Sequence, residues 1–241
     1  VLNENYVEVK IDTDTFYEVD PDTYEAIITV EYEDAPAVGE LVIEKKGEVL
    51  DAYKGGLFAD SEDKEFVYKE GSLAGAKFEI YAAEDIYTAD MQTDENGNRN
   101  KYYAEGDLVA TVVTGEDGKA KVSDLPLGKY RVVEVEAPYG YVLNKEEQYV
   151  TFVYVDDKTP VIRESLTFAN DRQKVDLSVA KLDGETGLPV SGAEFGLYAA
   201  EDIVNVDGKV IVEKDTLLEA AVSDANGDIQ FVKDYPLGHY Y

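Results

Sequence analysis

The chain has 241 residues, of which 44% are hydrophobic, so it can bury a sizeable core in one to three domains. Its formal net charge is -30 and no apolar run reaches the roughly 20 residues that cross a bilayer, so we expect neither a nucleic-acid partner nor membrane insertion. With no cysteine, the chain has no thiolate metal site and no Cys nucleophile, and its single histidine, His239, leaves almost nothing for His-based catalysis or the usual zinc sites. We expect no metal and no cofactor.

Strand-length runs rich in Val, Tyr and Thr follow one another along the chain, separated by short turns that contain Gly or Pro. No long stretch with the 3.6-residue period of a helix competes with them. The pattern predicts an all-β fold. The clearest runs are LVIEK (41–45), LVATVVT (108–114), KYRVVEVE (129–136), QYVTFVYV (148–155) and VDLSVAK (175–181).

The sequence repeats itself. GAKFEIYAAEDI (75–86) returns as GAEFGLYAAEDI (192–203), and SDLPLGKY (123–130) returns as KDYPLGHY (233–240). Val1-Leu2-Asn3 likewise matches Val142-Leu143-Asn144. The chain therefore covers part of a tandem array of similar β domains.

We expect three segments in this array. Residues 1–38 are the last strands of one repeat, 39–174 form a complete repeat, and 175–241 are the first strands of a third. The complete repeat carries an insert at 47–74 where the third has only LDGETGLPVS. Because the linkers APAVGE and DRQKVD are short, we expect a stiff rod in which neighbouring repeats contact each other.

Glu134 lies in the strand pattern YRVVEVE, where alternate residues face opposite sides of a sheet. One face carries Tyr130, Val132 and Glu134, and the other carries Val133 and Val135. Either the first face is inward, which buries a glutamate, or the valines form the core face and Glu134 is solvated. A similar choice applies to Lys45, since a lysine at the end of a strand is usually solvated.

Several ordered motifs of the complete repeat resemble the Cna B-type or SpaA-type domains of Gram-positive surface proteins and pilins. These motifs are LVIEK ending in Lys45, GAKFEIY, GKYRVVEVEAPYGY with Glu134, and LTFAN ending in Asn170. The resemblance implies tandem prealbumin-like (Ig-like) β-sandwich domains. It also implies an isopeptide bond between Lys45 and Asn170, with Glu134 as the proton shuttle.

The residue types suit that chemistry. An amine is a nucleophile only when neutral, and burial lowers the pKa of a lysine, while burial of a glutamate favours its protonated, proton-donating form. In an alternating strand, Lys45 lies on the same face as Leu41 and Ile43, which favours it over Lys46 as the reacting lysine. The same 11-residue spacing separates Asp34 from Lys45 and Asn170 from Lys181. Asp34 and Lys181 are therefore the corresponding candidates of the flanking repeats, and we expect their partners to lie before residue 1 and beyond residue 241.

The resemblance implies an extracellular, cell-wall-anchored protein in which these repeats form a stalk, with autocatalytic bond formation as the only chemistry. The alternative is an adhesin module that binds a host glycan or matrix protein, with insert 47–74 as the first place to look. Near-identical repeats favour the stalk, because a rod needs equivalent spacers. An enzyme acting on an external substrate is disfavoured by the lack of a second polar constellation.

Three Gly-containing segments superficially resemble calcium loops, but none has the full ligand spacing, and the pattern predicts hairpin turns. They are DENGNRN (94–100), GEDGK (115–119) and DANGD (224–228).

Overall fold

The computed structural model describes residues 18–23, 26–27, 34–55 and 64–241, and in these ranges all regular elements are β-strands, which confirms the predicted fold class. None of the described residues forms a helix that is long and apolar enough to cross a membrane. The strands are β1 (Glu18–Val19), β2 (Ala26–Ile27), β3 (Val38–Gly55), β4 (Lys64–Ser72), β5 (Lys77–Ala82), β6 (Ile86–Tyr87), β7 (Lys101–Tyr103), β8 (Leu108–Val113), β9 (Lys119–Leu125), β10 (Gly128–Glu136), β11 (Gln148–Phe152), β12 (Val161–Asn170), β13 (Leu177–Ala180), β14 (Glu194–Tyr198), β15 (Ile203–Val204), β16 (Val210–Val212), β17 (Leu217–Val222) and β18 (Asp228–Phe231).

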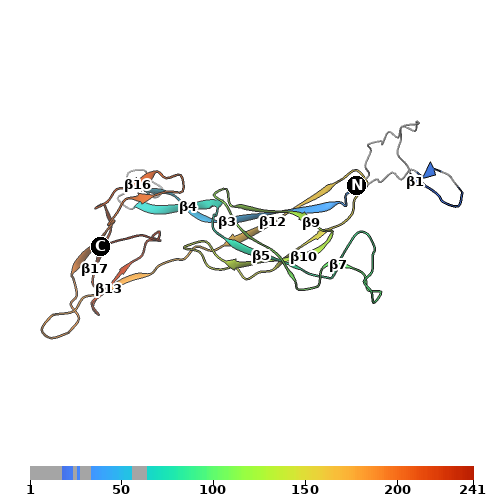
Figure 1. Cartoon of the computed structure of the whole chain (residues 1–241). Coiled ribbons are helices and arrows are strands. Elements are labelled where there is room, and N and C mark those ends of the chain that lie inside the picture. The colour runs from blue at the N-terminus through green and yellow to red at the C-terminus, as the bar shows by residue number, and fades with distance from the viewer. Residues whose placement is uncertain (1–17, 24–25, 28–33, 56–63) are drawn as a thin grey trace.

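Two facing sheets form the part of the chain that we call the middle unit (Figure 1). One sheet has the order β11-β10-β5-β8 and is antiparallel throughout. In the other, β3 pairs in parallel with β12 along one edge, and antiparallel with β9 and then β4 along the opposite edge. The first and last strands of the unit therefore lie side by side, although they are far apart in sequence.

The core of the middle unit follows from period-2 alternation on strands whose inner faces meet. On β5, and on β3 as far as Val49, every second residue is buried, as the inward side chains of Leu41 and Ile43 and of Phe78 and Ile80 show. The rings of Phe78 and Phe168 meet with centroids 4.8 Å apart, joining the two sheets.

The third unit, residues 175–241, consists of three separate strand pairs, β13 with β18, β14 with β17 and β15 with β16. Its buried side chains form a second core. In Figure 1 the two units lie end to end, with the C-terminus inside the third unit. The exact domain boundaries expected from the sequence remain a prediction, and most of the expected preceding repeat lies outside the described residues.

Matching hydrogen bonds at equivalent positions support the internal repeat. The Thr114 hydroxyl donates to the Leu73 carbonyl (2.8 Å) and accepts from the Ala76 N–H (3.0 Å). In the third unit, the Ser223 hydroxyl donates to the Val190 carbonyl (2.7 Å) and accepts from the Ala193 N–H (2.9 Å).

Tyrosines at equivalent positions make a second matching bond. Tyr130 donates to the Pro126 carbonyl and Tyr240 to the Pro236 carbonyl, at 2.7 and 2.6 Å. Each pair lies in the repeated motif PLG(K/H)Y, so the same local contacts are built twice from similar sequence.

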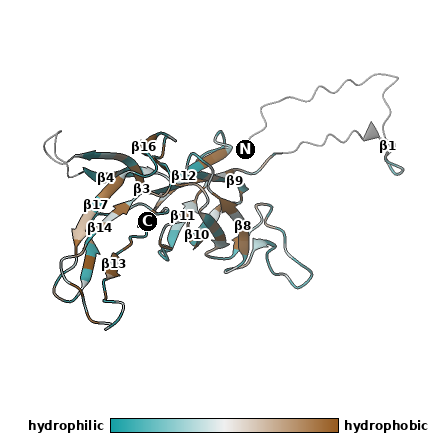
Figure 2. Ribbon diagram, turned by 90° about the vertical axis from the view of Figure 1, so that its left-hand side faces the viewer, coloured by the Kyte–Doolittle hydropathy of each residue, from teal (hydrophilic) through white to brown (hydrophobic). Residues whose placement is uncertain are grey.

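The insert predicted at 47–74 continues β3 beyond the sandwich and returns as β4, so that the two strands form a long hairpin. Its tip, residues 56–63, lies outside the described residues. Figure 2 views the molecule from the end where the third unit lies and shows this hairpin beside β16 and β17. Phe66 of β4 belongs to the core of the third unit.

The three calcium-like segments form turns, as the sequence predicts. The carboxylate of Asp94 accepts from the N–H groups of Asn96 and Asn98, and that of Asp224 accepts from Asn226 and Asp228. Asp117 caps the third turn in the same way, through the N–H of Lys119. Such side-chain to backbone bonds are the ordinary role of Asp in tight turns.

Replacing Thr114 with Val is expected to destabilise the middle unit by about 1–3 kcal/mol, because the Ala76 N–H loses its side-chain acceptor in a buried position. Native-state hydrogen exchange over Lys77–Ala82 would measure this loss. Thr111→Val, at an exposed position of β8, the strand that directly precedes Thr114, is the matched control and should leave exchange unchanged. Equal exchange in both variants would contradict the structural role of Thr114.

Candidate functional site

Lys45 lies on β3 and its side chain is buried between the two sheets of the middle unit, with 0% of its surface exposed. Leu41 and Ile43 precede it on the same inward face. The strand does not end at Lys45 but continues to Gly55, so the alternative of a solvated lysine at a strand end is wrong. Its backbone N–H donates to the Gly118 carbonyl (2.8 Å), and its carbonyl accepts from the Leu73 N–H (3.0 Å).

Glu134 lies on β10 with Tyr130 and Val132 on the same inward face, and it is 2% exposed. Val133 and Val135 are on the opposite face, so the alternative in which those valines form the core is wrong. In the register with β5, Glu134 lies opposite Phe78, and a bulge follows before Glu136. Glu136 is exposed, so of the two glutamates on this strand, Glu134 is the buried one.

Asn170 is the last residue of β12 and is 5% exposed. Parallel pairing with β3 places it opposite Gly47, two residues beyond Lys45. Gly47 is required by this close approach, because a Cβ there would lie 2.9 Å from the Asn170 carbonyl oxygen, 2.7 Å from Leu73 and 3.0 Å from Tyr141.

The structure brings these three side chains together. Lys45 Nζ donates to Asn170 Oδ1 at 2.6 Å. Asn170 Nδ2 donates to Glu134 Oε1 at 2.8 Å, and the same Oε1 lies 3.4 Å from Lys45 Nζ. One carboxylate oxygen therefore touches both the amine nitrogen and the carboxamide nitrogen.

Burial lowers the pKa of the Lys45 amine from its ordinary value, and the adjacent Glu134 carboxylate opposes this only in part. A fully buried amine next to a carboxyl group and a primary amide can exchange protons without bulk water. The arrangement has the parts that acyl transfer needs: a nucleophile with a lowered pKa, an acyl group in contact with it and a proton carrier in contact with the leaving nitrogen.

Asn144 was missed as a member of the site. Its backbone N–H donates to Glu134 Oε2 (3.1 Å), and its side-chain amide donates to the Ala169 carbonyl (3.0 Å), next to Asn170. Asn144 thus connects the glutamate to the end of β12. The recurring Val-Leu-Asn triplet was the available signal, and the first copy, residues 1–3, lies outside the described residues.

The flanking candidates, Lys181 and Asp34, lie outside this cluster of three side chains. Lys181 Nζ donates to the neighbouring Leu182 carbonyl (3.3 Å). Asp34 is exposed, at the start of the segment that leads into β3. Where their partners lie remains a prediction. Within the described ranges, no cluster of three or more His, Cys, Asp or Glu side chains is arranged to hold a metal ion.

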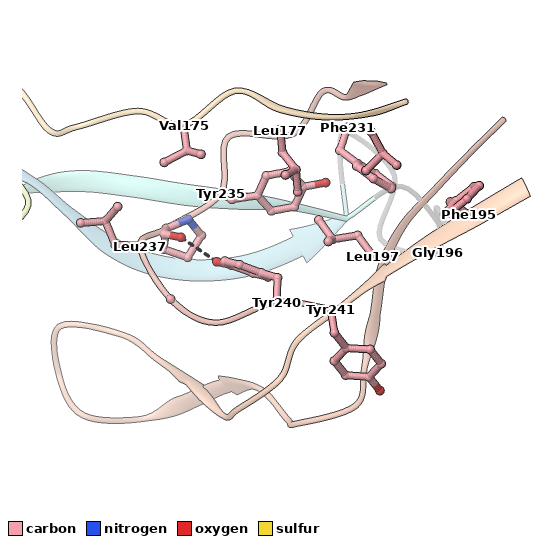
Figure 3. A pocket seen from close by; sticks show the side chains of 13 residues that line it. Val175, Leu177, Phe195, Gly196, Leu197, Phe231, Tyr235, Leu237, Tyr240 and Tyr241 are labelled. Atoms are coloured by element: carbon pink, nitrogen blue, oxygen red, sulfur yellow. Dashed lines mark hydrogen bonds between the residues drawn. The ribbon is translucent and has the colours of Figure 1, made fainter. Parts of the chain in front are cut away.

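An apolar groove of about 470 Å³ runs along the third unit, and Figure 3 shows the side chains that line it. Leu177, Phe195 and Leu197 form part of its wall, with Tyr240 donating to the Pro236 carbonyl at one side. In the middle unit, β12 pairs with β3 and β10 with β5 at the corresponding strand edges. Among the described strands, β13 and β14 of the third unit have one partner each, so these edges border an open groove.

Two successive β-sandwich units with matching internal contacts, one of them holding a buried lysine, glutamate and asparagine, define an array of prealbumin-like domains. A family model for the SpaA prealbumin-like fold domain matches residues 64–164 and 175–241, more than half of the chain. The chain therefore belongs to the SpaA prealbumin-like family, as the sequence motifs predicted.

Individual relatives share modest similarity. The trypsin-resistant surface T6 protein of Streptococcus pyogenes serotype M6 is 28% identical over 123 residues, which cover 50% of this chain and 21% of that protein. Among solved structures, the Bacillus anthracis TIE protein is 28% identical, with a TM-score of 0.46, and the match covers 85% of this chain and 27% of that one. The minor pilin GBS52 of Streptococcus agalactiae is 21% identical, with a TM-score of 0.32, and 57% and 45% of the chains are covered. The chain spans about a fifth of the curated relative's length.

Replacing Gly47 with Ala is expected to force β12 away from β3 at Asn170, at a cost of about 1–3 kcal/mol in the free energy of unfolding. Hydrogen exchange of β3 and β12 in the full chain would measure it. Gly184→Ala is the control, because a Cβ at Gly184 meets no atom within 4 Å. Unchanged exchange in Gly47→Ala would contradict the prediction that the pairing of β3 with β12 requires a glycine at this position.

Proposed function

We propose that the chain is a segment of the stalk of an extracellular, cell-wall-anchored surface or pilus protein, and that its middle unit is cross-linked by a Lys45–Asn170 isopeptide bond. The observation that carries this proposal is the contact of one oxygen, Glu134 Oε1, with both Lys45 Nζ and Asn170 Nδ2. Membership of the SpaA prealbumin-like family supports it. The neighbouring repeats of the same chain are the partners.

Bond formation begins when the buried amine passes a proton to Glu134 and becomes neutral. The lone pair of Lys45 Nζ then attacks Cγ of Asn170, and the carbonyl electrons move onto Oδ1. The second proton that Nζ must lose passes by way of Glu134 to Nδ2. When the Cγ–Nδ2 bond breaks, ammonia leaves, the carbonyl reforms and an amine and a primary amide have become a secondary amide.

Glu134 keeps the first proton and ends the sequence as a neutral acid beside the new amide. The unit therefore acts once on itself, and we do not expect it to be an enzyme for external molecules. The hydrogen bond from Asn170 Nδ2 to Glu134 (2.8 Å) suits proton delivery to the leaving nitrogen. The N–H of Asn144 holds the other carboxylate oxygen, Oε2, and so fixes the direction of the group.

The cross-link would close a loop between residues that are 125 positions apart. Applied to a loop of that length, the entropy model used for disulfides gives a stabilisation of about 5 kcal/mol. A chain without cysteine would thus gain a covalent tie that needs no oxidant.

The alternative function, a module that binds a host glycan or matrix protein through insert 47–74, has less support. The apolar side chains of that insert, Tyr53, Phe66 and Tyr68, pack against the third unit and are not presented to solvent as a group. The stalk therefore remains the better conclusion.

The intact mass of the denatured full chain tests the cross-link. The wild-type chain is expected to weigh less than its sequence by one ammonia, because one bond forms. Glu134→Ala should restore the full mass because it removes the proton carrier, and Asn170→Ala because it removes the acyl group.

Glu136→Ala is the matched control for this experiment, since it removes an exposed carboxylate from the same strand and should retain the ammonia loss. An unshifted mass of folded wild-type protein would overturn the proposed bond.

Stretching single molecules between their termini tests the mechanical role. In the wild type, the residues between Lys45 and Asn170 should contribute no extension, because the bond carries the force directly from β3 to β12. In Glu134→Ala the middle unit should release roughly 400 Å of additional contour length. Equal contour lengths in the wild type and in Glu134→Ala would contradict a force-carrying bond.

A further inference from the structure

The hairpin of β3 and β4 extends beyond the middle sandwich and reaches the third unit. Lys46–Gly55 pair with Ser72–Lys64, and this part of β3 lies past the strand's pairing with β9. The third unit has no equivalent hairpin at the corresponding place, where LDGETGLPVS closes with a single bridge between Leu182 and Pro189. The hairpin is therefore part of the middle unit but contacts the third.

Apolar side chains of the hairpin enter the core of the third unit. Phe66 is 7% exposed and lies in the same buried cluster as Leu218 and Tyr235. Its ring lies 6.1 Å from that of Tyr235 in an edge arrangement, and 4.6 Å from that of Tyr53. Aromatic pairs at these separations add specific geometry to the burial of apolar surface.

Both strands of the hairpin also form hydrogen bonds with the third unit. From β3, the carbonyls of Leu50 and Asp51 accept from the Val206 N–H and the Asn205 side chain, each at 3.0 Å. The hydroxyl of Tyr53 donates to the Leu218 carbonyl at 3.4 Å.

From β4, the hydroxyl of Tyr68 donates to the Asp234 carbonyl at 3.1 Å. The contact thus joins both strands of the hairpin to three separate parts of the third unit, namely the β15–β16 turn, β17 and the segment after β18.

Arg172 binds the linker into this contact. Its side chain is 7% exposed, its guanidinium lies 3.8 Å from the ring centroid of Tyr68, and it forms an ion pair with Asp234. Glu48 lies 3.8 Å from its Nε. Since an arginine stays charged in a protein, the nearby carboxylates and the aromatic ring stabilise this buried one. Arg172 also follows Asn170 by two residues, so the joint lies next to the candidate cross-link.

We propose that the β3–β4 hairpin is the docking element between consecutive units: it supplies part of the core of the third unit, which depends on it for a stable fold and a fixed orientation. The partner of this surface is the following repeat of the same chain. The proposal does not require the Lys45–Asn170 bond, and it assigns insert 47–74 to assembly of the rod and not to an external ligand.

Hydrogen exchange of the full chain, with and without Phe66→Ala, tests this dependence. Amides of β14, β17 and β18 are expected to exchange at least about tenfold faster in the variant, while those of β5 and β10 keep their wild-type protection. Val67→Ala, on the other face of β4, is the control and should change neither unit. Unchanged exchange in the third unit would overturn the proposal, and so would an equal loss of protection in both units.

A second measurement tests the orientation of the third unit relative to the middle unit and does not need a substitution in the core. Because the chain has no cysteine, spin labels can be placed at Glu164→Cys on β12 and Glu194→Cys on β14, both exposed positions. A narrow distance distribution is expected, which broadens when Arg172→Gln and Tyr68→Phe are combined. A broad distribution in the unmodified background, or no broadening in the double variant, would overturn the fixed joint.

Repeating the distance measurement in Glu134→Ala separates this proposal from the cross-link. The distribution should stay narrow there, even though the ammonia loss disappears. A distribution that broadens in Glu134→Ala alone would contradict the independence of the docking contact from the bond.

Discussion

The amine of Lys45 has to find its partners inside the protein, because it lies between two sheets with no exposed surface. An unpartnered buried charge opposes folding by several kcal/mol, roughly, so the fold around it is constrained to deliver a carboxyl group and an amide to the same point. Glu134 comes from one sheet and Asn170 from the other. The contact of these three side chains therefore requires that the sandwich close with β3, β10 and β12 in one defined register.

That register depends on backbone features as much as on the polar side chains. Parallel pairing of β12 with β3 is what places Asn170 near Lys45, and the absence of a side chain at Gly47 lets the two strands approach. The bulge after Glu134 ends the regular pairing with β5 where the chain leaves the core. The Asn144 N–H then returns from the following loop to the same carboxylate. The positions of the polar side chains therefore depend on the backbone at the edges of the core.

Much of this could be predicted from the sequence, because period-2 alternation is a local property. Alternation placed Glu134 on the face of Tyr130 and Val132, and Lys45 on that of Leu41 and Ile43. It left open which face is inward, and the resemblance of the motifs favoured these faces. Asn144 was not predicted, since it acts through its backbone in a loop where alternation carries no information. The hairpin was identified only as an insert. Its apolar residues, such as Phe66, pack on a different unit, and no periodicity within a segment reveals which distant surface it will cover.

The attachment of the third unit at two places, through the linker with Arg172 and through the hairpin, limits rotation as well as bending. A single linker lets one body turn about the long axis of its neighbour. The hairpin adds contacts at the β15–β16 turn and at β17, away from the contact of Arg172 with Asp234, and these restrict that turn. Because the third unit has only the short segment LDGETGLPVS in place of the hairpin, this fixed turn belongs to the joint between the middle and third units. The angular position of the third unit about the long axis would then be set by the middle unit.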